Sequence, residues 1–417
     1  MVHARTDNST FSEPAGISYL RGRLANLPIG ELIMAGPRTA RFMMSAASRH
    51  LRRGDQRYPE IPTRLMTFGT AASVLLDEIV LAFMATTRLD ADDATFGRIA
   101  RETEAANAML EAAGIFEHPA RLHPEPAAPR VKVRAETYRG IRYQHVSFES
   151  GYEPVIDLPG TTRWLSTTNN QTAHSYVLRH REPRPWLVNL HGFGMGNPSD
   201  LLALRALHYH RDLGLNVIQP VFPVHGPRSG GPKGEQALTL DFLNNLHSVS
   251  QAIWDTRRIM AWARAEAGAR SFAVHGVSMG GYVSALLAGL VDDLDCVIAG
   301  VPTVDLAWVM RRNVPDEERS ALDERALLGS MADRIHQPIS PLSFEPRLPP
   351  SRRFVYAGVV DRVATPGQAH RLWTHWGKPA VLWYRGSHLG FAWSREVRRF
   401  IDDALWTSGV TRGVSTP

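Results

Sequence analysis

The sequence predicts a doubly wound α/β domain with a mostly parallel sheet, preceded by a separate helical segment. Short, unbroken apolar runs recur through the later part of the chain, as is typical of strands buried on both faces of a parallel sheet. Stretches with helical periodicity separate most of these runs. A chain of 417 residues is also longer than one ordinary domain, which favours an additional segment.

The composition is that of a globular protein. Hydrophobic residues make up 44% and charged residues 21% of the chain, and the net charge is +6. The single cysteine, Cys296, lies in the apolar run DCVIAGVP, so it is expected to be a buried strand residue. One cysteine excludes an intrachain disulfide.

Residues 1–125 are expected to form a mostly helical N-terminal extension. Helical periodicity is clear from Phe96 to Gly114, and a proline-rich stretch follows it. The apolar stretch 65–85 carries Asp77 and Glu78 near its centre, which disfavours a membrane span and favours a helix packed in protein. The first residues lack the apolar core of a secretory signal, so a cytoplasmic location is expected.

A basic segment of this extension, residues 37–53, predicts an amphipathic helix that begins at Pro37. Arginines are expected on one face and an apolar set on another, the arginines being Arg38, Arg41, Arg49 and Arg52 and the apolar set Met44, Ala47 and Leu51. The favoured interpretation is a surface helix that covers the main domain. Peripheral contact with an anionic membrane is the alternative. No nucleic-acid partner is expected, because no binding motif is present, and the sequence does not indicate the oligomeric state.

Residues 126–417 are expected to form the α/β domain. Alternating patterns in 131–150 and 173–182 predict antiparallel strands at its entry. The core strands are expected in WLVNLHG, LNVIQPVFP, FAVHG, CVIAGVP, FVYAGVV and AVLWYRG. Residues 303–350 contain no obvious core strand, and two interpretations stay open for them: a lid over a pocket, or an enlarged crossover.

One serine stands between glycines at the junction of a predicted strand and a predicted helix, in Gly276-Val277-Ser278-Met279-Gly280. A sharp strand-to-helix turn leaves no room for side chains on its flanks, so glycine is needed there. The turn would place the serine oxygen at a helix N-terminus, where the helix dipole favours developing negative charge. With this motif, the chain resembles the α/β-hydrolase superfamily, in particular its serine esterases and lipases, over residues from about 131 to 408.

The resemblance implies a serine, an acid and a histidine in that order along the chain. Asp361 fits the acid and His388 the base, since each follows a predicted core strand. Asp305 is the alternative acid, because it follows CVIAGVP, the predicted strand that precedes FVYAGVV in the sequence. The other candidates for the base are His191, His225 and His275.

The resemblance also implies an oxyanion hole made of backbone N–H groups. One donor would be Met279, and the other Phe193 or Gly194 in the loop after WLVNLHG. Residues near the site mouth are candidates for substrate contact, with a structural role as the alternative, namely His191, His225 and Arg228. No metal and no cofactor are implied.

These features predict a serine hydrolase that cleaves a carboxylic ester, or a thioester or amide, through an acyl-enzyme on Ser278. A small acylated or lipid-like substrate is expected. Three alternatives stay open: an acyltransferase, a peptidase of small acylated substrates, and a non-catalytic protein that binds a ligand or a membrane through its N-terminal helices.

Overall fold

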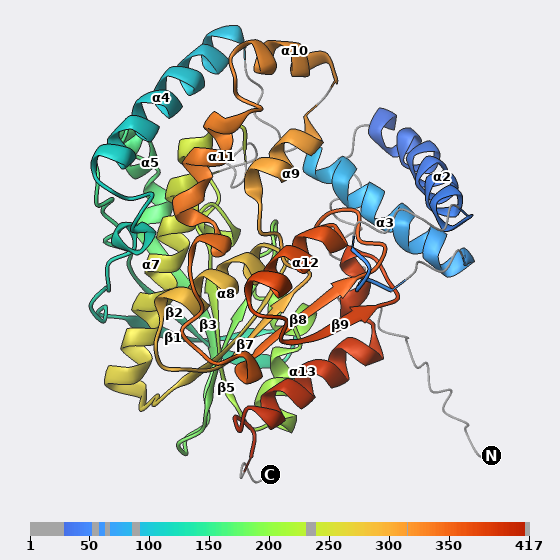
Figure 1. The fold of residues 1–417 in the computed structure, drawn as a ribbon. Helices are drawn as coiled ribbons and strands as arrows, with labels where there is room; N and C mark the ends of the chain where they lie inside the picture. Colours follow the sequence, from blue (N-terminus) through green and yellow to red (C-terminus); the bar gives the residue numbers. More distant parts are fainter. Residues whose placement is uncertain are drawn as a thin grey trace, which may run out of the picture.

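The computed structural model describes residues 29–51, 58–62, 67–85, 92–230, 239–314 and 316–412 (Figure 1). Within them, a nine-stranded sheet has the order β1-β2-β3-β5-β4-β6-β7-β8-β9. The strands are β1 (Lys132–Tyr138), β2 (Ile141–Glu149), β3 (Thr172–Leu178), β4 (Trp186–Leu190), β5 (Asn216–Val221), β6 (Phe272–Val277), β7 (Leu294–Gly300), β8 (Arg353–Gly358) and β9 (Ala380–Tyr384). Pairing is antiparallel from β1 to β5 and parallel from β5 to β9. The predicted α/β-hydrolase fold, with a mostly parallel sheet entered through antiparallel strands, is confirmed.

The sheet is covered on both faces, which explains the unbroken apolar runs. Every residue of β4, β5 and β6 is buried, whereas β1 at the edge is largely exposed. Adjacent residues of β4 enter different cores: Val188 joins the larger cluster and Leu187 the smaller one. Cys296 on β7 is completely buried, as predicted.

The larger cluster includes residues of α7 (Phe242–Ala267) and α8 (Met279–Leu290), and the smaller one residues of α6 (Asp200–Ala203) and α13 (Arg395–Thr407). Two further helices are α5 (Thr161–Leu165) and α12 (Pro366–His375). Asp241 caps the start of α7, and Gly268 ends it with a φ of 73°, a left-handed conformation in which glycine has no Cβ penalty.

The described part of the N-terminal extension is mostly helical, with α2 (Ile29–Leu51), α3 (Phe68–Ala85) and α4 (Asp93–Ala112). Two expectations for the basic helix were wrong. Pro37 lies inside α2, which begins eight residues earlier, and Met44 is 67% exposed while Phe42 is buried. A proline inside a helix removes one intrahelical hydrogen bond and crowds the carbonyl four residues earlier, and α2 nevertheless continues through Pro37. Arg52 and the opening residues 1–28 lie outside the described residues, and so do the side chains of Ala47, Arg49 and Leu51.

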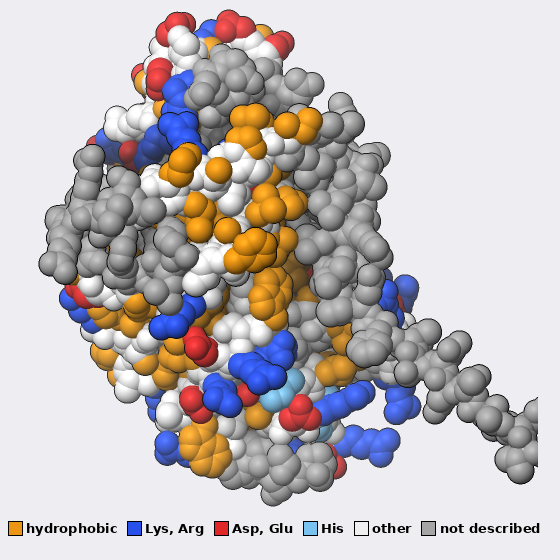
Figure 2. Space-filling view, turned by 90° about the vertical axis from the view of Figure 1, so that its right-hand side faces the viewer, with side chains coloured by type: hydrophobic (Ala, Val, Ile, Leu, Met, Phe, Trp, Pro, Cys, Tyr) orange, Lys and Arg blue, Asp and Glu red, His pale blue; other side chains and the backbone are white. Residues whose placement is uncertain are grey.

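The predicted packed helix over 65–85 corresponds to α3, which buries Val74, Asp77, Glu78 and Ala82. Across the described ranges, no helix combines the length and the apolar character needed to cross a membrane. The face that carries α2 and α3 nevertheless shows hydrophobic side chains at the surface (Figure 2). Large exposed ones on these two helices are Ile33, Met34, Met44, Phe68 and Leu75. Membrane contact through these helices stays a prediction.

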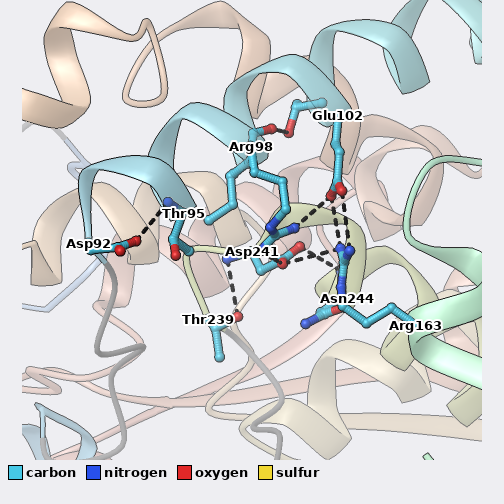
Figure 3. A network of polar contacts seen from close by, with 10 residues as sticks. Asp92, Thr95, Arg98, Glu102, Arg163, Thr239, Asp241 and Asn244 are labelled. Atoms are coloured by element: carbon cyan, nitrogen blue, oxygen red, sulfur yellow. Dashed lines mark hydrogen bonds and ion pairs between the residues drawn. The ribbon is translucent and has the colours of Figure 1, made fainter. Parts of the chain in front are cut away.

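An ion-pair network joins α4 to the α/β domain (Figure 3). Arg98 on α4 donates to Glu102 at 2.7 Å and to Asp241 at 3.0 Å, and Arg163 on α5 donates to Glu102 at 2.8 Å. Asp241 also caps α7 and lies 3.5 Å from the guanidinium of Arg163, so its carboxylate connects α4, α5 and α7.

Residues 303–350 form α9 (Leu306–Asn313), α10 (Asp316–Glu324) and α11 (Ser330–His336), followed by short 3₁₀ turns. Figure 1 shows these helices above the sheet, between α4 and α3. Helix α11 contacts α4, α7 and α9. The absence of a core strand was predicted correctly for the described part of this segment, and a lid function stays a prediction.

Candidate active site

Ser278 occupies a strained turn between β6 and α8. Its backbone has φ 56° and ψ −114°, which is unusual for a residue with a side chain. A Cβ on Gly276 would collide with the carbonyl oxygen of Gly280, and one on Gly280 would collide with that of Leu190. Both flanking glycines are therefore required by the close approach of strand, turn and helix.

The structure brings Ser278, His388 and Asp361 together in one chain of hydrogen bonds. The Ser278 hydroxyl lies 3.0 Å from Nε2 of His388, and Nδ1 of His388 lies 2.7 Å from Oδ2 of Asp361. Since a carboxylate only accepts, His388 carries its proton on Nδ1 and Nε2 is free to accept from the serine. Oδ1 of Asp361 accepts from the N–H groups of Val363 and Ala364, both at 2.8 Å, which fixes the carboxylate.

The surroundings of His388 favour its protonated form. Burial lowers the pKa of His388, but the negative charge of Asp361 and the hydrogen bond to it, together with the charge of Asp77, raise that pKa above its ordinary value overall. A buried imidazole with this environment can take up a proton during a reaction and hold it.

The loop after β4 lies against the serine. A Cβ placed on Gly192 would be 3.6 Å from Cβ of Ser278 and 3.5 Å from the carbonyl oxygen of Val277. The next residues of this loop are Phe193 and Gly194, the latter with φ 75°. The N–H of Met279 is the first of α8, where helical N–H groups have no intrahelical acceptor. The predicted donors thus come from two segments that meet at Ser278.

The alternative acid and one alternative base have structural contacts. Asp305 caps α9 by accepting from the N–H of Trp308 at 2.8 Å, and it pairs with Arg371 at 2.5 Å. His275 contacts Asn189 and the Tyr356 hydroxyl, and burial, with a smaller effect of Arg205, lowers the pKa of His275 to about 3. Both side chains therefore have structural roles.

The three candidates for substrate contact are all buried. His191 accepts from the N–H of Phe222 at 3.0 Å, and burial, followed by the charge of His225, lowers the pKa of His191 to about 3. His225 contacts the Pro223 carbonyl at 2.8 Å. Arg228 has no exposed surface and pairs with Asp255 at 2.8 Å, so in this structure it braces the loop rather than facing a substrate.

Sequence reasoning missed Asp77, which reaches the site from helix α3. Oδ2 of Asp77 accepts from the backbone N–H of His388 at 2.9 Å and from that of Arg362 at 2.8 Å. The neighbouring Glu78 accepts from Nε of Arg362 at 2.8 Å. Two acids in the middle of an apolar helix were a signal, because buried carboxylates need partners. The sequence does not say where those partners lie.

No family model matches the chain. It is 40% identical over 359 residues to "Uncharacterized protein MT2702" and to "Uncharacterized protein Rv2627c", from two strains of Mycobacterium tuberculosis, covering 85% of this chain and 86% of each relative. Among solved structures, it is similar to acetyl xylan esterase 1 from Thermoanaerobacterium sp. JW/SL YS485, with a TM-score of 0.49 and 14% identity over 70% of this chain and 92% of that one. This likeness is too low to inform on activity; the strand order and the turn at Ser278 identify the fold.

Proposed function

We propose that this chain, which belongs to the same family as the two M. tuberculosis proteins and has the α/β-hydrolase fold, is a serine hydrolase. Its reaction would be the cleavage of a carboxylic ester of a small acylated or lipid-like compound. The observation that carries the proposal is the hydrogen-bonded chain from Ser278 through His388 to Asp361, with the serine on a strained turn. Serine is a weak nucleophile unless a positioned base accepts its proton.

In this mechanism, Oγ of Ser278 attacks the carbonyl carbon while Nε2 of His388 takes its proton. Asp361 holds the imidazole in the required tautomer and stabilises the imidazolium. The oxyanion is bound by the N–H of Met279 and by that of Phe193 or Gly194. His388 then protonates the leaving alcohol. A water molecule attacks the acyl-enzyme while His388 takes its proton, and His388 returns this proton to Oγ of Ser278 as the carboxylic acid is released.

The test is turnover of p-nitrophenyl esters of increasing acyl length by the native chain and by Ser278→Ala. We expect the variant to lose a factor of about 10³ or more in kcat while its unfolding temperature stays close to the native value. The matched control is Ser284→Ala on the same helix, since the Ser284 hydroxyl donates to the carbonyl of Gly281 in its own helix. Equal activity of the native chain and Ser278→Ala would overturn the proposal.

The same assay separates the alternatives. Transfer of the acyl group to added alcohols in preference to water would identify an acyltransferase, and cleavage of acylated amides at a higher kcat/KM than of esters would identify a peptidase. A folded native chain that turns over no ester, thioester or amide would leave the non-catalytic alternative.

A further inference from the structure

We propose that Asp77, on the N-terminal helix α3, is a positioning residue. It holds the loop after β8 that carries Asp361, here called the acid loop, in a fixed position relative to the loop after β9 that carries His388, here called the histidine loop. The inference rests on the proposed function. It gives the N-terminal extension a part in the active site, although the extension contributes no reacting group.

One oxygen atom makes both connections. Oδ2 of Asp77 accepts from the N–H of Arg362, next to Asp361, and from the N–H of His388 itself. These residues follow β8 and β9 and are 285 and 311 residues distant from Asp77 along the chain. The bond between His388 and Asp361 joins side chains, whereas Asp77 joins the two backbones that carry them.

Buried apolar contacts fix helix α3 in place beside the loop that carries Asp361. Val74 of α3 and Phe42 of α2 are buried against Val359 and Val360, which lie just before Asp361. The guanidinium of Arg362 lies 4.5 Å from the ring centroid of Phe42 and pairs with the buried Glu78. Helices α2 and α3, which contact each other and are called the hairpin α2–α3 below, are therefore packed directly on the acid loop.

A buried carboxylate at position 77 costs free energy. Asp77 is completely buried, and burial, followed by the charge of Asp361, raises the pKa of Asp77 to about 7. Its second oxygen, Oδ1, has no hydrogen-bond partner within the described part of the chain. An apolar side chain would avoid these costs but would leave two buried N–H groups without an acceptor. The groups that interact electrostatically around this position are Asp361, His388, Arg362, Glu78, Arg312 and Tyr384.

The test compares Asp77→Ala, Asp77→Asn and the control Glu78→Gln on the ester that the native chain hydrolyses best. We expect Asp77→Ala to lower kcat about 10²-fold with KM changed less than about twofold, because misplacing a reacting group by about 1 Å costs a factor of this size. Asp77→Asn keeps an acceptor oxygen and should recover kcat to within about tenfold of native. It should also move the acid limb of the pH–rate profile to lower pH, since it removes a negative charge beside His388.

Glu78→Gln removes a buried negative charge from the same helix but contacts neither backbone N–H. Because the Glu78 carboxylate pairs with the Arg362 side chain, this variant should lower the unfolding temperature, and it should lower kcat much less than Asp77→Ala does. A native kcat in Asp77→Ala, or an equal loss in Glu78→Gln, would overturn the inference.

A second readout does not depend on turnover. The Nδ1 proton of His388, bonded to Asp361, should give a downfield proton NMR resonance, assigned by its loss in His388→Gln. We expect this resonance to persist in Glu78→Gln and to shift or disappear in Asp77→Ala. If Asp77→Ala does not fold, the acid limb of the pH–rate profile and the downfield resonance of Asp77→Asn decide whether Asp77 has the positioning role. If even the native chain hydrolyses nothing, the proposed function fails, and an unchanged resonance in both Asp77 variants would still contradict the positioning role.

Discussion

The turn at Ser278 and the hairpin α2–α3 contribute to one site in different ways. At the turn, short-range geometry restricts the residue types, because Gly276 and Gly280 face backbone atoms that leave no space for a Cβ. In the hairpin, Asp77 accepts a hydrogen bond over a long sequence separation, and apart from Glu78 the residues nearest to it in α3 are apolar. A local constraint therefore produces a recognisable sequence motif, whereas a distant contact is indicated in the sequence only by a charged residue within a mostly apolar helix.

The largest effect should come from Asp361, the acid in the hydrogen-bonded chain that starts at Ser278. Asp361→Asn is expected to lower kcat by about 10³ to 10⁴, because the amide favours the wrong tautomer of His388. Steady-state kinetics measure it. The control Asp305→Asn should retain nearly full activity, since asparagine is also a good helix cap and the lost pair with Arg371 is partly exposed. A large loss in Asp305→Asn together with an active Asp361→Asn would reverse the assignment of the acid.

The glycines offer a direct contrast between the two regions. Gly276→Ala should destabilise the chain by more than about 3 kcal/mol, because its Cβ would overlap backbone atoms. In α2, a Cβ added to Gly36 would meet nothing within 4 Å, so Gly36→Ala should stabilise its helix by about 0.5 to 1 kcal/mol. Urea unfolding measures both. Equal midpoints for the two variants would show that the turn is not sterically restricted.

The docking of the hairpin can be weakened without touching the turn. Phe42→Ala should destabilise the docked hairpin by about 3 kcal/mol through loss of a buried ring. Hydrogen exchange should then accelerate in α3 and stay unchanged in α7. Met44→Ala, on the same helix but exposed, is the control. Uniform acceleration in both helices would mean that the hairpin and the α/β domain unfold as one unit.

Two buried histidines predict that stability falls in acid. His191 and His275 have pKa values of about 3 in the folded chain, below the ordinary value of about 6.5 in the unfolded chain. The unfolded state therefore binds more protons below pH 6.5, and stability is lost as the pH falls from there toward 3, by up to about 1.4 kcal/mol per pH unit for each histidine. Urea unfolding at pH 7.5 and pH 5 measures the loss. Equal stability at both values would contradict neutral, buried histidines.

The strands and the site at the sheet edge could be predicted because their signals are local. The apolar runs located β4 to β9, and the order of Ser278, Asp361 and His388 follows from the ends of three strands. The orientation of α2 could not be predicted, because the periodicity of its apolar residues does not reveal that Phe42 meets Arg362. The same limit concealed Asp77: its charge was visible, but its acceptance of the His388 N–H depends on tertiary packing.

Covalent labelling of the native chain with a fluorophosphonate, followed by mass spectrometry of the peptide that contains Ser278, gives the sharpest test of Ser278 as the nucleophile. This reagent reports a serine activated by a base. We predict one adduct, on Ser278, which is absent in Ser278→Ala and forms far more slowly in His388→Ala. An adduct on a different residue, or none on the folded native chain, would contradict the assignment of this serine.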